Sequence, residues 1–221
     1  IKDITLYMEE CKKMKIKVLC PDVNESFYKF AVNKKSEIRF GLGAIKGVGE
    51  SAVNSIVEER KQNGIYKSFS DFVKRVDLRS CNKRTIESLV LSGGFDSFEI
   101  DRSRYFHVED GQSYIEKMIK FGNKIQQDKS STQMDIFGGT QEIELESPKA
   151  PICEKWKTME FLTKEKEVVG IYLSAHPLDD FLFESSNFSN SVIKDIKLLE
   201  KNKSRDLFFS CVIVDVDHRE S

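Results

Sequence analysis

The sequence predicts a mainly helical fold with small β elements. Apolar residues recur at spacings of three and four in several stretches, as Ile4, Tyr7 and Cys11 do near the start of the chain. Glycines and prolines divide these stretches into short segments. Alternation typical of a strand is confined to residues 27–40 and 207–216. We therefore expect short helices and few strands.

Composition is that of a soluble globular chain. Its 221 residues include 35 Lys and Arg and 36 Asp and Glu, which gives a formal net charge of −1. No apolar run approaches the roughly 18 residues that a membrane helix needs, so no membrane partner is expected. Residues 1–105 hold 20 basic and 15 acidic side chains, and this surplus suits a front half that meets a polyanion.

Cysteine and histidine usage argues against a metal site or a catalytic triad. The chain has 5 cysteines, widely spaced and without a CxxC pair, and 3 scattered histidines. Isolated cysteines indicate reduced thiols and a cytoplasmic location. We predict no catalytic residues, no metal ligands and no cofactor in this chain.

The elements expected in the first half follow one another closely. A helix over Asp3–Lys17 ends before Pro21, and a small hairpin follows over 27–40. Short helices are then expected over Gly41–Gly64, Ser70–Val76 and Asn82–Leu91. Ser70 and Asn82 are the expected N-caps, and Gly93-Gly94 is the expected C-terminal stop. A longer helix is expected within Asp101–Phe121.

The second half changes character. Residues 126–151 are polar, then acidic with two prolines, and we predict an exposed linker there. Helical periodicity returns over Trp156–Leu173 and ends at His176-Pro177. A β-rich run over Leu207–Val216 has no partner strand left in the sequence, so a truncated β domain is expected from about residue 191.

The most informative segment is Ile45–Val57. Gly47 and Gly49 would allow a tight turn, with Val48 packed inward as a plug. Backbone amides at the turn and at the start of the next helix would face outward and could donate to a phosphate oxygen, with Lys46 beside them. This is the pattern of the helix–hairpin–helix motif, which binds the DNA backbone without reading bases. The alternative is a glycine-rich turn between two core helices.

A second motif lies in the polar linker. Ile136 and Phe137 are apolar groups on a solvated tether, and they could fill a pocket while Gln133 makes hydrogen bonds at its rim. The string resembles the sliding-clamp-binding motif of bacterial replication and repair proteins. The candidate clamp-binding residues are Gln133, Met134, Asp135, Ile136 and Phe137. Alternatively, the linker folds back onto its own domain through Phe137.

Taken in order, these strings resemble the C-terminal part of the bacterial replicative DNA polymerases of family C, the DNA polymerase III alpha subunits. The matching strings are Pro21-Asp22-Val23-Asn24, Ile38–Gly49, Phe69–Phe72, Asn82–Leu89, Gly93–Asp96, Gln133–Phe137 and Glu165–Asp179. The resemblance covers nearly the whole chain, and the order of the motifs is more specific than any one of them.

The resemblance implies an organisation and a function. It implies the end of a fingers region over 1–24, a tandem helix–hairpin–helix domain over 25–125, the exposed linker with its clamp-binding peptide over 126–151, a helical connector over 152–190 and the start of a truncated OB-fold over 191–221. The candidate DNA-binding residues are Lys46, Gly47, Val48, Gly49, Glu50, Ser51, Lys83 and Arg84.

The expected partners are duplex DNA, the sliding clamp (the beta subunit) and other replicase subunits. The family's catalytic carboxylates, with their Mg²⁺, are expected before Ile1. The chain is therefore expected to tether a DNA-directed DNA polymerase and to be non-catalytic by itself.

Two other functional classes stay open at this point. Helix–hairpin–helix DNA glycosylases of the lyase type carry a lysine where this chain has Ser51, and an aspartate near the position of Asp71. A repair scaffold without a polymerase is the other. The pair Asp215 and Asp217 could mimic a two-metal carboxylate site, but it lies too near the end of the sequence for a palm domain.

Overall fold

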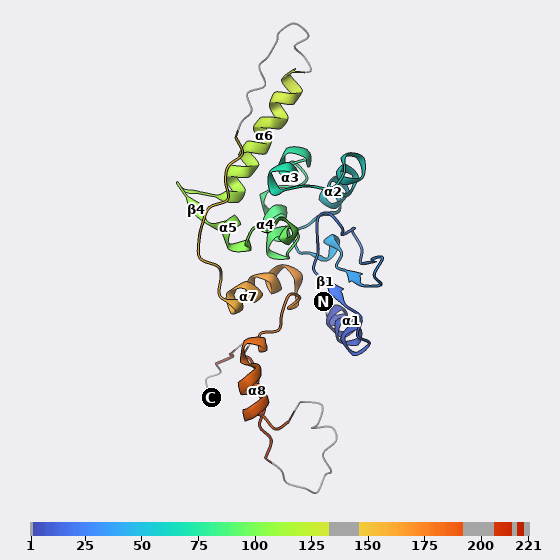
Figure 1. Cartoon of the computed structure of the whole chain (residues 1–221), viewed down its shortest axis with the longest axis vertical. Helices are drawn as coiled ribbons and strands as arrows, with labels where there is room; N and C mark the ends of the chain where they lie inside the picture. The colour runs from blue at the N-terminus through green and yellow to red at the C-terminus, as the bar shows by residue number, and fades with distance from the viewer. Residues whose placement is uncertain (1, 133–145, 192–205, 214–215, 219–221) are drawn as a thin grey trace. The chain divides into compact units, whose positions relative to one another are not determined.

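A computed structural model describes residues 2–132, 146–191, 206–213 and 216–218 (Figure 1). The clamp-like peptide 133–137 and Asp215 lie outside the described residues. The chain divides into two compact units, Ile1–Leu173 and Ser174–Ser221. The expected boundaries at 125 and 151 thus fall inside the first unit, because the helix that follows the linker packs against the helices that precede it.

The first unit opens with helix α1 and a small sheet. Helix α1 spans Lys2–Lys13, and it stops short of the expected Lys17 because Lys15 takes a left-handed conformation at φ 59°. Strands β2 (Ala31–Val32) and β3 (Ile38–Arg39) pair antiparallel and confirm the predicted hairpin. Strand β1 (Val18–Leu19), which the sequence pattern did not predict, pairs parallel to β3 at the other edge.

Short helices make up the rest of this unit, as the sequence predicted. In chain order they are the 3₁₀ helix η1 (Leu42–Ala44), α2 (Glu50–Asn63), α3 (Phe69–Arg75), α4 (Lys83–Leu91), η2 (Asp96–Phe98), α5 (Arg102–Phe106), α6 (Tyr114–Thr132) and α7 (Thr158–Val169), with strands β4 (Val108–Glu109) and β5 (Gln112–Ser113) forming a second hairpin between α5 and α6. Asn82 caps α4 as predicted, by accepting from the Thr85 amide. The cap of α3 is Ser68 and not Ser70.

Helix α6 corrects the predicted start of the exposed linker. It begins at Tyr114 with reciprocal hydrogen bonds between Ser113 and Glu116, the pattern of a capping box. It then continues through residues 126–132, because the Gln126 amide group donates to two backbone carbonyls at the end of α3. The polar composition that predicted a linker here therefore belongs, over 126–132, to the end of a helix.

An aromatic core holds α3, α5 and the turn after α4 together. Phe69, Phe72, Phe95 and Tyr105 are fully or almost fully buried, and their rings meet mostly edge to face at centroid distances of about 5 to 6 Å. Burying each such ring contributes about 2–3 kcal/mol. These contacts fix α4, which packs beside the predicted DNA-binding turn.

The second unit contains the 3₁₀ helix η3 (Asp179–Phe181) and helix α8 (Leu182–Phe188). The strand predicted over 207–216 is not formed in the described part of that stretch, 207–213 and 216. There the Phe208 carbonyl accepts from the Asn190 amide, and the Phe208 amide donates to the Asn190 side-chain oxygen. Across the parts of the chain described, no helix has both the length and the apolar character needed to cross a membrane.

Candidate nucleic-acid interface

The turn between η1 and α2 presents its polar backbone outward and its two apolar side chains, Ile45 and Val48, inward. Val48 is 7% exposed and belongs to the core, as predicted. The residues around it, Lys46, Gly47, Gly49, Glu50 and Ser51, are all exposed. The predicted plug therefore exists, and protein does not cover the turn.

The start of α2 offers free amide donors at this turn. The first helical hydrogen bond runs from the Val53 amide to the Gly49 carbonyl, so the amides of Glu50, Ser51 and Ala52 have no acceptor within their own helix. Gly49 is the N-cap residue and has no side chain to satisfy them. The Glu50 carboxylate lies in the same turn and adds a negative charge. Its expected contribution to the interface is thus its amide and not its side chain.

The two glycines of the turn are not equivalent. Gly47 has φ +87°, and a Cβ there would lie 2.9 Å from the Ser88 Oγ atom. Gly49 has an ordinary extended conformation, with φ −82° and ψ 160°, and the nearest atom to a Cβ there would be 4.0 Å away. The prediction that both glycines are needed for the turn is therefore correct for Gly47 only. At Gly49, the missing side chain leaves open space in front of the amides.

Helix α4 crosses close to the turn and brings one predicted cation with it. The Thr85 hydroxyl donates to the Gly47 carbonyl over 3.2 Å, and the Arg84 side chain lies 3.6 Å from where a Gly47 Cβ would be. Arg84 is exposed, and no carboxylate of the described residues pairs with it. The structure therefore places the Arg84 side chain beside Gly47.

Lys83 is less available than Arg84. Its ammonium group pairs with Glu116 at 2.8 Å and with Glu87 at 3.7 Å. The hydrogen bond to Glu116 raises the pKa of Lys83, and the same bond, helped by the Ser113 amide, lowers the pKa of Glu116 from 4.5 to about 2. Both groups therefore stay charged at neutral pH, and a phosphate would have to compete with Glu116 for this cation.

Comparisons with known proteins identify a motif and a set of relatives. A family model described as a helix-hairpin-helix motif matches residues 15–105. DNA polymerase III subunit alpha of Pasteurella multocida is 37% identical over 196 residues, and that of Escherichia coli K12 is 32% identical over 198 residues. These matches cover 88% and 89% of this chain. The chain is homologous to a segment of DNA polymerase III subunit alpha. It spans only 16% and 17% of the length of these two relatives.

In this polymerase-homologous segment, helix α7 supports the turn, a feature that the sequence analysis missed. The Lys46 amide donates to the Val168 carbonyl near the end of α7 over 2.8 Å. Helix α7 is itself fixed by Glu165, which is 0% exposed, accepts from Arg102 at 3.1 Å and accepts from the Leu173 amide at 2.8 Å. The sequence does carry a sign of this buried ion pair, because the charged Glu165 lies on the same helix stripe as the apolar Leu162 and Val169.

Arg102 joins this ion pair to the second glycine turn. Its guanidinium group makes two hydrogen bonds to Asp96 and another to the Leu91 carbonyl. It also fills the space beside Gly93, where a Cβ would lie 2.4 Å from the Arg102 Nη2 atom. Gly93 and Gly94 are buried, unlike Gly47 and Gly49. Protein covers the second turn, so it has no exposed amides comparable to those of the first.

Asp71, the residue that kept a glycosylase in consideration, has a structural role in the fold. Its carboxylate accepts from the Lys67 amide at 3.0 Å and pairs with Arg75 at 2.9 Å. The first contact fixes the loop before α3, and the second joins the first turn of α3 to its last residue. No group of three or more His, Cys, Asp or Glu side chains suited to a metal ion occurs in the parts of the chain that the structure describes.

Proposed function

We propose that this chain is the DNA-binding and clamp-tethering segment of a replicative DNA-directed DNA polymerase. In this proposal, the turn around Val48 binds the backbone of duplex DNA without sequence preference, and residues 133–137 dock the sliding clamp. The family resemblance extends the proposal to contacts with other replicase subunits, a cytoplasmic location and a truncated OB-fold after residue 191. Catalysis and the Mg²⁺ of the whole polymerase would then belong to residues outside this chain.

One observation carries the DNA-binding part. Val48 is buried while the residues on both sides of it are exposed, so the turn directs the unpartnered amides of Glu50 and Ser51 toward solvent. The positive end of the α2 dipole lies at the same place, and Lys46 and Arg84 add two cations. A phosphate oxygen complements all three features. Since none of them can distinguish bases, binding without sequence preference is expected.

A glycosylase is the weaker alternative. Ser51 cannot form the Schiff base that a lysine at this position would form. Asp71 is engaged by Lys67 and Arg75, as described above. Release of a base from damaged duplex DNA by the purified chain would contradict the non-catalytic proposal.

The substitution Gly49→Ser tests the proposed phosphate site directly. A serine at the N-cap accepts from an amide in the first turn of α2 and fills the open space in front of it. We expect duplex affinity to fall about tenfold, since a charge-assisted hydrogen bond of about 1.5 kcal/mol is lost. The fold should be as stable as before, or more so, because serine is a better N-cap than glycine.

The measurement is fluorescence anisotropy with labelled duplexes of two unrelated sequences, paired with thermal unfolding. Gly111→Asn is the matched control, because Gly111 also faces open space and its left-handed φ of 73° suits asparagine. Unchanged duplex affinity in the stable Gly49→Ser variant would refute the phosphate site. An affinity that does not fall with rising salt would refute it too, because phosphate contacts release counterions.

A further inference from the structure

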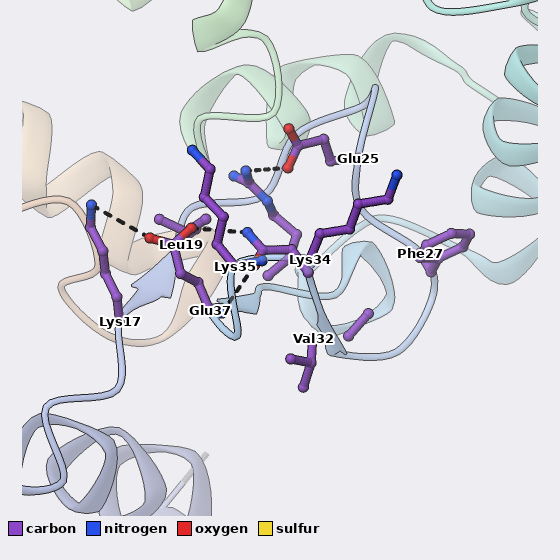
Figure 2. A pocket seen from close by; sticks show the side chains of 11 residues that line it. Lys17, Leu19, Glu25, Phe27, Val32, Lys34, Lys35 and Glu37 are labelled. Atoms are coloured by element: carbon purple, nitrogen blue, oxygen red, sulfur yellow. Dashed lines mark hydrogen bonds and ion pairs between the residues drawn. The ribbon is translucent and has the colours of Figure 1, made fainter.

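An open hollow of about 590 Å³ lies over the three-stranded sheet of the first unit (Figure 2). Its charged lining comprises four basic residues, Lys17, Lys34, Lys35 and Arg39, and two acidic residues, Glu25 and Glu37. The hollow is formed by β1, β3 and the turn between β2 and β3, so it is separate from the turn at Val48.

Both acidic residues of the hollow are already paired. Glu25 pairs with Arg39, and Glu37 lies 3.9 Å from the Lys17 ammonium and also accepts from the Asn33 side chain. Lys34 and Lys35 are exposed, and no carboxylate in the described part of the chain is within ion-pair distance of either. Figure 2 shows both side chains extending away from the turn, in different directions. The two lysines thus give the hollow an unbalanced positive charge.

Partly exposed aromatic side chains lie in the chain segment just before the two lysines. Phe27, which lines the hollow, is 44% exposed, and its neighbours Tyr28 and Phe30 are 39% and 41% exposed. The Arg60 guanidinium lies 4.9 Å from the centroid of the Phe27 ring and orients it. Of these three rings, Phe27 is the one that lines the hollow, whereas the Phe30 ring packs edge to face against Phe40.

We propose that this hollow binds single-stranded DNA. Lys34 and Lys35 would contact consecutive phosphates, and an unstacked base would lie against Phe27. Positive charge combined with an accessible ring is what single strands require, because their bases present free faces. A duplex keeps its base faces stacked and could use only the lysines. An acidic peptide could likewise pair with the lysines but would leave the Phe27 ring unused.

The test measures binding of a labelled oligo(dT) of about 15 nucleotides to the full 221-residue chain. In the variant Lys34→Gln with Lys35→Gln, we expect weaker binding and a salt dependence whose slope is smaller by about 1.4, the value for two single-strand phosphate contacts. Phe27→Leu should lower the affinity about fivefold or more through lost stacking. Phe27→Leu should leave binding of a blunt duplex unchanged, because a duplex could use only the lysines of the hollow.

The matched control removes two other exposed lysines, Lys120→Gln with Lys124→Gln on α6, and should bind oligo(dT) normally. Gly49→Ser separates this proposal from the previous one, because it should weaken duplex binding and leave oligo(dT) binding intact. Equal loss in the two lysine pairs, or full affinity after Lys34 and Lys35 are changed, would overturn the proposal. Tighter binding of an oligoglutamate peptide than of oligo(dT) would assign the hollow to a protein partner instead.

Discussion

Gly47 and Gly49 flank the same buried valine but meet different physical demands. Gly47 occupies the left-handed region, and its hydrogen atoms face Ser88 on α4. Gly49 could carry a side chain without strain. Sequence reasoning treated the two as one pair, because a GxG string does not show which residue has the positive φ. The exposed Gly49 is therefore the better probe of binding, and Gly47 the better probe of folding.

We predict that Gly47→Ala destabilises the fold by about 1–2 kcal/mol, because alanine pays the cost of a left-handed conformation. The clash with the Ser88 hydroxyl adds to this cost. Chemical denaturation followed by circular dichroism measures the change in the free energy of unfolding. The double variant Gly47→Ala with Ser88→Ala separates the two terms, because it removes the Ser88 hydroxyl without placing a glycine inside α4 and leaves the backbone strain. Full stability of Gly47→Ala would contradict the conformation of this turn.

At the scale of elements, local signals decided what the sequence could predict. Asn82 as the cap of α4 and the stop at Gly93 were predictable, since each depends on a short-range rule. Strand β1 was not, because two residues carry no alternation and the strand exists only by pairing with β3, 20 residues later in the chain. The length of α6 was missed for a similar reason. The contact that extends this helix joins Gln126 to α3, and polar composition alone indicated a linker.

Helix α7 shows why the linker does not mark the end of the DNA-binding unit. It follows the linker in the chain but bonds to Lys46 at the turn through Val168. The only strongly buried carboxylate among the described residues, Glu165, holds it against α5 through Arg102. A shortened chain that ends at residue 125 would therefore leave the Arg102 guanidinium without Glu165 and the turn without its support.

We predict that Glu165→Ala lowers the free energy of unfolding by about 3 kcal/mol. Arg102 is 5% exposed and pairs with two carboxylates, those of Asp96 and Glu165, and the substitution removes the buried one. Thermal and chemical unfolding of the full chain measure this loss. Glu167→Ala is the matched control, because Glu167 lies on the same helix but is exposed, and it should change stability by less than about 0.5 kcal/mol. Equal effects of the two substitutions would contradict the buried ion pair.

At the scale of the whole molecule, the two ends of the predicted linker return to the same unit. Helix α6 ends at Thr132, and beyond the undescribed stretch Arg104 donates to the carbonyls of Ala150 and Pro151. In the sequence, the clamp-like peptide therefore stands between two segments that both belong to the first unit. Phe137 follows Thr132 by 5 residues, which limits its distance from the end of α6 to about 17 Å. A short tether of this kind gives a high effective concentration.

This geometry makes the proposed clamp contact testable as an avidity effect. We predict that Gln133→Ala with Phe137→Ala abolishes capture of the chain by an immobilised clamp and leaves its affinity for a linear duplex unchanged.

On duplex DNA that carries a loaded clamp, the unsubstituted chain should bind at least about 100-fold more tightly than on DNA alone, and the double variant should lose this gain. Gln141→Ala with Ile143→Ala, which removes the same kinds of side chain from the same loop, should bind normally. If the Gln133 and Phe137 variant still binds the clamp, the anchor lies elsewhere in the chain. If it loses duplex binding as well, the loop folds back onto the DNA-binding unit, and Phe137 serves the fold instead of a partner.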